Sequence, residues 1–436
     1  MSSRTAQIRA LAQRDPALAE APLAALLADL FGIAPRNVAI NLDRYSLNSL
    51  NGFFETDAGA FFFKFHQEEG EEAMAGEYYR ADILARAGLP VDQPVHVSAE
   101  PGEQILVYRR RDEPRFSDVL RALDMEDDPA ARAVAVEAER GLSRALIATY
   151  RASLHPVTAA EVAAEPIHRL FHERLVTHGA AGEAYPGGRY REFYLGRRFA
   201  FPGLALDWAD LSTRRFTVNG VTYARTLGEL FDAAEARLRP ERLADAGGVV
   251  AHGDAHNANV WFTPKAGGEG GEAGARLSFF DPAFAGENVP ALLAEVKATF
   301  HNVFAHPFWL YDPDLASARF SAAARLAPGE LIVETDWAPS PVRADLLAVK
   351  ADEVWRPLLA ELAARALLPP DWREVIRLAL FLCPTLVMDL RAGARTHTPI
   401  SSLIGLSVAV MVGSPPLQGA DAVTRFLDRI DPDQSR

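Results

Sequence analysis

The sequence predicts an α+β protein built as two lobes. A small β-rich N-terminal lobe spans residues 1–108, begins with a helical segment over 1–35 and contains one further helix; a larger, mainly helical C-terminal lobe spans 109–436. Three observations carry this prediction. Apolar residues recur at helical spacing up to about residue 33, strand-like alternation takes over from residue 37, and helical patterns dominate after the arginine cluster at 109–111.

In the N-terminal lobe, the alternation predicts five strands, over 38–42, 52–56, 60–65, 95–97 and 104–108. The second and third of these form a hairpin across the turn at 57–59. A charged helix over 68–87 is expected to follow, because Gly88 and Pro90 are typical of the end of a helix.

In the C-terminal lobe, the pair Asn219-Gly220 inside an alternating stretch predicts a two-residue hairpin turn. A helix over 227–238 and a short strand over 276–280 follow, and the stretch 266–274 is expected to be a flexible loop. From residue 290 to the end, we expect helices with connecting loops.

Composition limits the classes of function. The chain has 45 basic and 58 acidic residues, a net charge of −13, which argues against binding to nucleic acid or to an anionic membrane. The one cysteine, Cys383, excludes a disulfide framework and a multi-cysteine zinc site, and its apolar neighbours predict that it is buried. No secretory signal is recognisable, and the apolar runs at 381–388 and 403–412 are short for a membrane span, so a cytoplasmic protein is expected.

The segment His252-Gly-Asp254-Ala-His256-Asn-Ala-Asn259, between two apolar strands, carries the strongest functional signal. An aspartate and an asparagine five positions apart match the spacing of the catalytic aspartate and the metal-binding asparagine in protein-kinase catalytic loops. Asp254 would accept the proton of a hydroxyl nucleophile. Asn259 would offer a neutral oxygen to Mg²⁺, and Asp281, at the end of the next apolar strand, would be the charged ligand.

This motif resembles the signature of the aminoglycoside phosphotransferase and choline kinase-like family, whose members have the protein-kinase-like fold. Every motif position of the catalytic loop is kept, whereas Phe280-Asp281-Pro282 departs from the family's usual residues after the aspartate. The resemblance covers mainly residues 38–110 and 245–290. It implies ATP- and Mg²⁺-dependent transfer of the γ-phosphoryl group to a hydroxyl of a small molecule, with His252 and His256 supporting the loop.

The resemblance also implies a lysine on the third strand of the small lobe, and Lys64 is there, on the strand face of Phe62 and His66. The chain contains only four lysines, so a cation among phenylalanines indicates an anionic partner, which ATP phosphates would supply. Glu77, on the following helix, is implied as the residue that orients Lys64.

The segment over 46–52 lies where the phosphate-covering loop of the family is found. It has one glycine, and Ser49 and Asn51 are its candidate phosphate contacts. No pattern identifies the acceptor, and no oligomeric state is predicted. The candidate acceptor-lining residues are His301, His306, Trp309, Tyr311, Asp312, Asp389 and Arg391.

Two other functions stay open at this point. A nucleotide-binding module without turnover would share the motifs, and the altered segment after Asp281 and the glycine-poor loop are compatible with it. A metal-dependent hydrolase would use His252, Asp254 and His256 as ligands on alternate positions of a strand. The hydrolase leaves Lys64 and the Asp–Asn spacing unexplained.

Overall fold

A computed structural model describes residues 3–41, 49–66, 80–98, 100, 103–179, 184–264, 274–394 and 397–435. Contacts within the chain divide it into two compact units. The first comprises Met1–Ala85 and Pro90–Glu113, and the second comprises Arg86–Leu89 and Pro114–Arg436. The first is a sheet with a few helices and the second is mainly helical, which confirms the predicted α+β class. The boundary drawn from the sequence after residue 108 stays a prediction.

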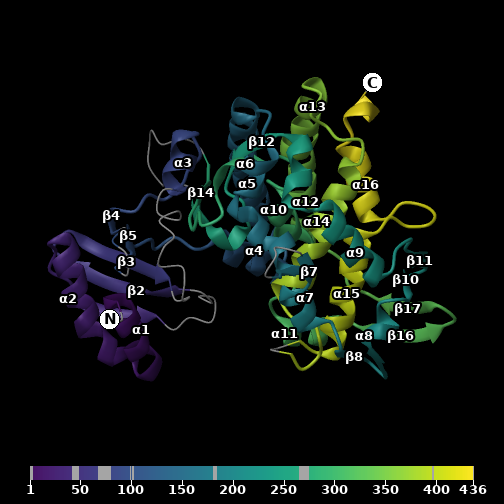
Figure 1. Ribbon diagram of the computed structural model, residues 1–436, viewed down its shortest axis with the longest axis horizontal. Coiled ribbons are helices and arrows are strands. Elements are labelled where there is room, and N and C mark those ends of the chain that lie inside the picture. The colour runs from purple at the N-terminus through teal and green to yellow at the C-terminus, as the bar shows by residue number, and fades with distance from the viewer. Residues whose placement is uncertain are drawn as a thin grey trace. The chain divides into compact units, whose positions relative to one another are not determined.

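The first unit is built on a five-stranded antiparallel sheet of strand order β1-β2-β3-β5-β4 (Figure 1). Its strands are β1 (Arg36–Asn41), β2 (Ser49–Thr56), β3 (Gly59–His66), β4 (His96–Ser98) and β5 (Ile105–Arg109). The predicted hairpin between the second and third strands is confirmed, since Thr56 pairs with Gly59 across its turn. Its helices are α1 (Arg4–Arg14), α2 (Pro16–Phe31) and α3 (Arg80–Arg86).

Two findings refine the expected helices of this unit. The helical segment at the N-terminus is two helices, because Asp15 leaves the helical conformation and its side chain caps α2, with Pro16 at the first helical position. Of the charged helix expected over 68–87, the structure describes α3, and residues 67–79 lie outside the described part of the chain.

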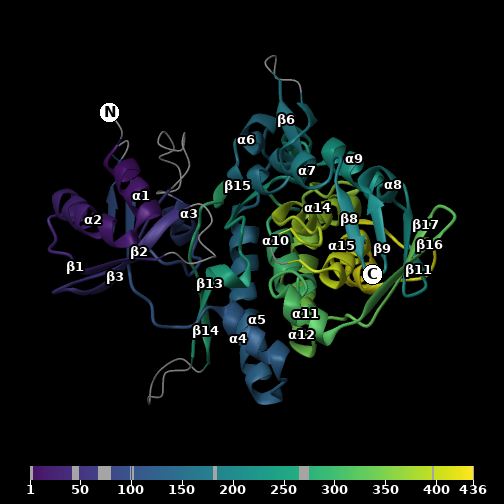
Figure 2. The same cartoon turned by 90° about the horizontal axis from the view of Figure 1, so that it is seen from below.

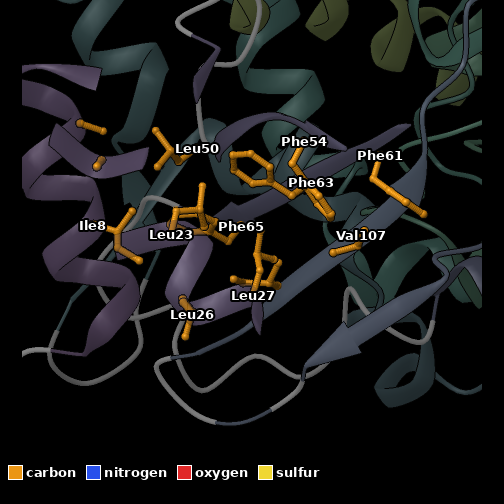
Figure 3. Close-up of a cluster of buried hydrophobic side chains, with 13 residues drawn as sticks. Ile8, Leu23, Leu26, Leu27, Leu50, Phe54, Phe61, Phe63, Phe65 and Val107 are labelled. Atoms are coloured by element: carbon orange, nitrogen blue, oxygen red, sulfur yellow. The ribbon is translucent and has the colours of Figure 1, made fainter. Parts of the chain in front are cut away.

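The core of this unit lies between one face of the sheet and helices α1 and α2. Phe61, Phe63 and Phe65 alternate along β3 and pack with Leu23 and Leu27 of α2 (Figure 3). Side chains alternate across a strand, so the residues between these phenylalanines face the other side of the sheet. Phe62 and Lys64 are half-buried there. The sequence pattern thus assigned the two faces of β3 correctly.

The second unit is mainly helical (Figures 1 and 2). Its α-helices are α4 (Phe116–Met125), α5 (Pro129–Ser153), α6 (Ala159–Ala163), α7 (Gly188–Phe193), α8 (Trp208–Leu211), α9 (Leu227–Arg237), α10 (Val296–Thr299), α11 (Pro313–Arg319), α12 (Pro341–Val349), α13 (Arg356–Ala364), α14 (Trp372–Val387), α15 (Pro399–Gly413) and α16 (Ala422–Arg429). Short helices of 3₁₀ type are η3 (Pro166–Leu170), η4 (His172–Arg174), η5 (Pro240–Ala246), η6 (Asn257–Asn259) and η9 (Pro432–Ser435). Helices α10 and α12 continue into π-helical turns, η7 (Phe300–Phe304) and η8 (Lys350–Trp355).

The two apolar runs of the sequence form α14 and α15, which contact each other and lie among the other helices of the unit (Figure 2). Helix α15 is buried nearly all round, as expected of a helix that is apolar on every face, and α14 is buried from Val375 to Leu386. Cys383, on α14, is buried as expected. Among the described residues, no helix combines the length and the apolar character that a membrane span needs.

Short strands complete the second unit. They are β6 (Val176–His178), β7 (Ala184–Pro186), β8 (Arg198–Phe201), β9 (Leu204–Asp207), β10 (Arg215–Val218), β11 (Val221–Thr222), β12 (Gly248–Ala251), β13 (Val260–Thr263), β14 (Arg276–Phe279), β15 (Gly286–Pro290), β16 (Ala322–Ala327) and β17 (Glu330–Thr335). The hairpin turn predicted at Asn219-Gly220 is confirmed, and both residues have the positive φ that such a turn needs.

The expectation of helices alone after residue 290 is wrong. Strands β16 and β17 form a hairpin, and β17 also pairs in parallel with β10. The first of these strands is rich in alanine, which favours helices, so local preference pointed the wrong way. The partner of this strand, β17, pairs with β10, more than a hundred residues earlier in the chain, and β16 extends the resulting sheet.

Candidate functional site

The loop 252–259 joins β12 to β13, and each of these strands is held by an antiparallel partner, β15 and β14 respectively. Gly253 has a φ of +76°, and a Cβ atom placed on it would lie 2.3 Å from the carbonyl oxygen of Phe284. Only glycine tolerates both conditions. The backbone of the loop therefore contacts the segment that follows Asp281.

His252 shapes this loop from inside. It is fully buried, its Nε2 lies 3.0 Å from the carbonyl oxygen of Phe280, and its Nδ1 accepts from the backbone N–H of Asp254 at 3.4 Å. A carbonyl can only accept, so Nε2 carries the proton and the ring is neutral. Burial lowers the pKa of His252, in agreement with this neutral form.

Asp254 is partly exposed, with 15% of its side chain accessible, and two basic groups flank its carboxylate. Its Oδ1 lies 3.6 Å from Nζ of Lys297, and its Oδ2 lies 3.7 Å from Nε2 of His256. Within the described chain, Oδ1 accepts no hydrogen bond. Burial alone would raise the pKa of Asp254, but its basic surroundings, the charge of Lys297 foremost, outweigh burial and lower the pKa. Asp254 is therefore ionised at neutral pH and can accept a proton.

Lys297, which sequence reasoning did not select, lies on α10 with 4% of its side chain exposed. Its Nζ lies 2.9 Å from Nε2 of His301, one helical turn later, and Nδ1 of His301 lies 2.6 Å from the hydroxyl of Tyr311. The ammonium donates to Nε2, so the ring donates from Nδ1 to the tyrosine. The rarity of lysine in this chain was the signal that could have found Lys297.

A buried network fixes the start of α10 and so the position of Lys297. Glu295 accepts hydrogen bonds from the hydroxyl of Tyr150 at 2.5 Å and from Nζ of Lys350 at 2.9 Å. Lys350 also pairs with Glu139 at 3.0 Å, and the pKa of Lys350 is raised because the two carboxylates outweigh its burial. A second lysine of this chain thus serves structure rather than chemistry.

The π-helical turn η7 is hydrogen-bonded to the loop 252–259. Oδ1 of Asn302 accepts the backbone N–H of Asn257 at 2.8 Å, and the carbonyl oxygen of Asn302 accepts from Arg343 at 2.8 Å. The Arg343 guanidinium is buried and forms a forked ion pair with Asp124, the shortest contact being 2.6 Å. The loop is therefore connected, through one asparagine, to a buried ion pair.

Asn259 and Asp281 lie at the same end of the β13–β14 ladder, because the carbonyl oxygen of Asn259 accepts the N–H of Phe280. The side-chain nitrogen of Asn259 donates to the carbonyl oxygen of Asp254 at 3.0 Å, which leaves its Oδ1 as the available donor atom for a cation. Asp281 has a φ of +55°, directly before Pro282. A non-glycine residue in this region is strained by about 1–3 kcal/mol, and such strain is concentrated at functional sites.

These two oxygen donors fit Mg²⁺, which is commonly held by one or two protein groups together with substrate phosphates. In the part of the chain that is described, no three His, Cys, Asp or Glu residues gather as a metal site. Both ring nitrogens of His252 contact the backbone. The arrangement therefore does not support His252, Asp254 and His256 as the ligand set of a metal-dependent hydrolase.

The candidates of the N-terminal lobe lie in the first unit. Asn51 of β2 is directly opposite Lys64 of β3, so both side chains are on the sheet face away from the core. Asn51 is buried and Lys64 is half-buried. Ser49 begins β2, but its side chain, like the whole of Glu77, lies outside the described residues.

The acceptor candidates separate into distinct groups. His301 contacts Lys297, and Tyr311, with 39% of its surface exposed, contacts His301. The ring of His306 is tilted relative to that of Tyr311, with ring centroids 5.3 Å apart. The remaining candidates are buried or form ion pairs. Trp309 is fully buried, Asp312 pairs with Arg121, and Asp389 pairs with Arg391.

Together, these elements define a chain of the protein-kinase-like class. A small antiparallel sheet has a lysine on its third strand, and a mainly helical unit carries an aspartate and an asparagine on a loop between two strand pairs, followed by a second aspartate.

No protein-family model matches the sequence, and no curated protein matches it either. Similar solved structures include a spectinomycin phosphotransferase in complex with ADP and spectinomycin, at 11% identity and a TM-score of 0.38, with 89% of this chain and 98% of that chain covered. An ethanolamine kinase from Plasmodium vivax has 10% identity and a TM-score of 0.34, covering 90% and 81%. A fructosamine-3-kinase, described as putative, from Thermobifida fusca has 16% identity and a TM-score of 0.36, covering 89% and 98%. Because these TM-scores are below 0.5, we take the fold from the elements of the chain itself.

The buried histidines of this site predict acid sensitivity. Burial lowers the pKa of His252, and it lowers the pKa values of His301 and His306 well below the usual value. The unfolded chain then binds more protons than the folded chain as the pH falls below about 6.5. The free energy of unfolding is therefore expected to decrease below this pH, by up to about 1.4 kcal/mol per pH unit for each such histidine.

Urea unfolding at pH 7.5 and pH 5.5 measures this effect. The variant His301→Gln is expected to reduce the difference between the two pH values, since its side chain does not titrate. Equal free energies of unfolding at both pH values for the natural sequence would contradict the prediction.

Proposed function

We propose that this protein transfers the γ-phosphoryl group of ATP, with Mg²⁺, to a hydroxyl of a small molecule. The observation that carries the proposal is the environment of Asp254. Its carboxylate is kept ionised by neighbouring cations, and its Oδ1 has no hydrogen-bond partner among the described residues. It stands on the loop whose other end carries Asn259, beside the strand end that carries Asp281.

In this reaction, Asp254 orients the acceptor hydroxyl and takes its proton. The hydroxyl oxygen forms a bond to the γ-phosphorus, the bond from that phosphorus to the β,γ-bridging oxygen breaks, and ADP leaves with the electron pair. Positioning and charge stabilisation supply most of the rate enhancement of phosphoryl transfer. The hydrogen bonds from the loop backbone to His252 and to Asn302 would hold Asp254 in position for proton transfer.

Mg²⁺ would be held by Oδ1 of Asn259 and the carboxylate of Asp281, and when bound it neutralises charge on the phosphates. In the first unit, Lys64 would bind the α- and β-phosphates and Glu77 would orient it. Ser49 and Asn51 are proposed to line the phosphates as well. The position of Asn51 on the same sheet face as Lys64 supports this assignment.

Replacing the proposed charged metal ligand tests the nucleotide role. Asp281→Asn keeps the size of the side chain, and asparagine tolerates a positive φ, so the backbone is expected to be unchanged. We expect weaker ATP binding by calorimetry in the presence of Mg²⁺ and no change in the presence of EDTA. Equal affinities of the natural and variant proteins for ATP with Mg²⁺ would contradict the assignment of Asp281.

A screen for turnover separates an enzyme from a silent nucleotide-binding module. The protein is incubated with ATP, Mg²⁺ and a library of hydroxylated metabolites, and products are identified by the mass of an added phosphoryl group. ATP hydrolysis without acceptor is measured in parallel. Nucleotide binding with neither transfer nor hydrolysis would favour the silent module and overturn the proposed function.

A further inference from the structure

A row of three hydrogen-bonded side chains begins at Lys297, beside Asp254, and ends at Tyr311. Nζ of Lys297 lies 2.9 Å from Nε2 of His301, and Nδ1 of His301 lies 2.6 Å from the hydroxyl oxygen of Tyr311. Lys297 and His301 are buried, whereas 39% of Tyr311 is exposed. The row therefore connects the surroundings of Asp254 to a tyrosine that solvent reaches.

The ammonium at one end of this row determines the direction of both hydrogen bonds. An ammonium can only donate, so Nε2 of His301 accepts and carries no proton. Burial lowers the pKa of His301 well below its usual value, in agreement with a neutral ring whose single proton is on Nδ1. Nδ1 then donates, and the hydroxyl oxygen of Tyr311 accepts.

The hydroxyl proton of Tyr311 is not used within the described chain. The hydrogen bond with His301 is the only one that Tyr311 forms with a described residue, and in it the hydroxyl accepts. A phenol keeps its proton at neutral pH. The bonds of a hydrogen-bonded row polarise one another, so a row that starts at a cation makes its last donor stronger. The hydroxyl of Tyr311 is therefore a strengthened donor that is available to a ligand.

Side-chain contacts place Tyr311 in one cluster with Asp254. Lys297 lies 3.6 Å from Oδ1 of Asp254, and His256 lies 3.7 Å from Oδ2. The ring of His301 is near those of His256 and Tyr311, with centroid distances of 5.6 Å and 6.2 Å. Asp254, His256 and Tyr311 are the members of this cluster that solvent reaches. A molecule that binds at Asp254 and extends beyond one hydroxyl group is thus expected to contact Tyr311.

We infer that the hydroxyl of Tyr311 donates a hydrogen bond to a second oxygen atom of the acceptor, whose reacting hydroxyl lies at Asp254. The inference rests on the proposed function and specifies its substrate class: polyhydroxylated compounds such as sugars and polyols, rather than simple amino alcohols. An ammonium group has no lone pair with which to accept from Tyr311, and the charge of Lys297 would repel it. Tyr311 is therefore a specificity-determining residue, and Lys297 and His301 fix the direction in which it donates.

The first experiment tests the direction of the row without turnover. Nitrogen-15 NMR of the imidazole groups distinguishes a protonated ring nitrogen from an unprotonated one, and the variant His301→Gln identifies the signals of His301. At pH 7.5 we expect a proton on Nδ1 and none on Nε2. A proton on Nε2 with none on Nδ1 would make Tyr311 the donor to His301 and would overturn the inference.

The second experiment compares acceptors that differ at one carbon atom. Glucose, 2-deoxyglucose and glucosamine carry a hydroxyl, a hydrogen or an ammonium group there, and so do glycerol, propane-1,3-diol and 2-aminopropane-1,3-diol. These compounds are included in the library of the turnover screen. We expect the hydroxyl member to have a higher kcat/KM than the ammonium member, and the best acceptor of the library to contain an oxygen besides its reacting hydroxyl. The opposite preference, or a best acceptor without a second oxygen, overturns the inference.

The variant Tyr311→Phe removes only the hydroxyl. It is expected to raise the KM for the best acceptor about 3- to 10-fold, the effect of losing one neutral hydrogen bond. The value of kcat and the affinity for ATP should stay the same, because Tyr311 contacts neither the nucleotide nor the reacting atoms. The matched control is Tyr185→Phe on β7, since Tyr185 has a similar exposure of 41%. This control should leave the KM unchanged.

The outcomes separate this inference from the proposed function. An unchanged acceptor KM for Tyr311→Phe, or an equal increase for Tyr185→Phe, overturns the inference and leaves the proposed function standing. The NMR measurement needs no turnover and can also overturn the inference alone. Transfer to no compound of the library overturns the proposed function, and the inference with it.

Discussion

Asp254→Asn is expected to lower kcat for transfer to an acceptor by about 10²–10⁴, the usual contribution of a general base. The amide keeps the size of the side chain but cannot take the proton of the hydroxyl. Asp254 belongs to the acceptor side of the reaction, so ATP affinity in the presence of Mg²⁺ should stay the same. Initial rates at saturating ATP, with an acceptor identified by the screen, measure the effect.

The matched control for this prediction is Asp207→Asn. Asp207 lies in the same unit, has 68% of its side chain exposed and pairs only with an exposed arginine, Arg198. Its substitution should leave kcat unchanged. If Asp254→Asn retained turnover within a factor of ten of the natural protein, Asp254 would not be the base.

Arg343→Met is expected to reduce the free energy of unfolding by about 3–5 kcal/mol, because it leaves the buried carboxylate of Asp124 without its partner. It also removes the donor to the carbonyl oxygen of Asn302, whose side chain holds the backbone of Asn257. Chemical denaturation at neutral pH gives the stability change.

Two further variants sharpen this test. Arg198→Met breaks an exposed arginine–aspartate pair of the same kind and should cost less than about 1 kcal/mol. The double variant Arg343→Met with Asp124→Leu removes both buried charges and should recover part of the lost stability. A loss for Arg343→Met as small as that for Arg198→Met would show that the ion pair does not support the unit.

Much of the second unit's site was predictable because its residues are close in sequence. His252, Asp254, His256 and Asn259 lie within one short loop, and the spacing of these residues between two apolar strands predicts the chemistry. Asp281 follows the next strand, and antiparallel pairing of β13 with β14 brings it back to Asn259. Short-range patterns of this kind need little knowledge of the tertiary structure.

Lys297 was not predictable in the same way. Lys297 is one of four lysines and could have been noticed for its rarity, but nothing in the sequence indicates which element it faces. The same holds for Asn302, whose contact with Asn257 joins residues far apart in the chain.

The order of strands in the first unit and the two faces of β3 follow from the sequence alone, and so does the hypothesis that the loop 252–259 carries phosphoryl-transfer chemistry, because side-chain periodicity and turn residues act over a few positions. Only the tertiary structure decided that an alanine-rich stretch becomes β16, and which cations surround Asp254. Both depend on contacts between segments that are distant in the sequence. Once such contacts bury an ionisable group, burial and the neighbouring charges determine its pKa.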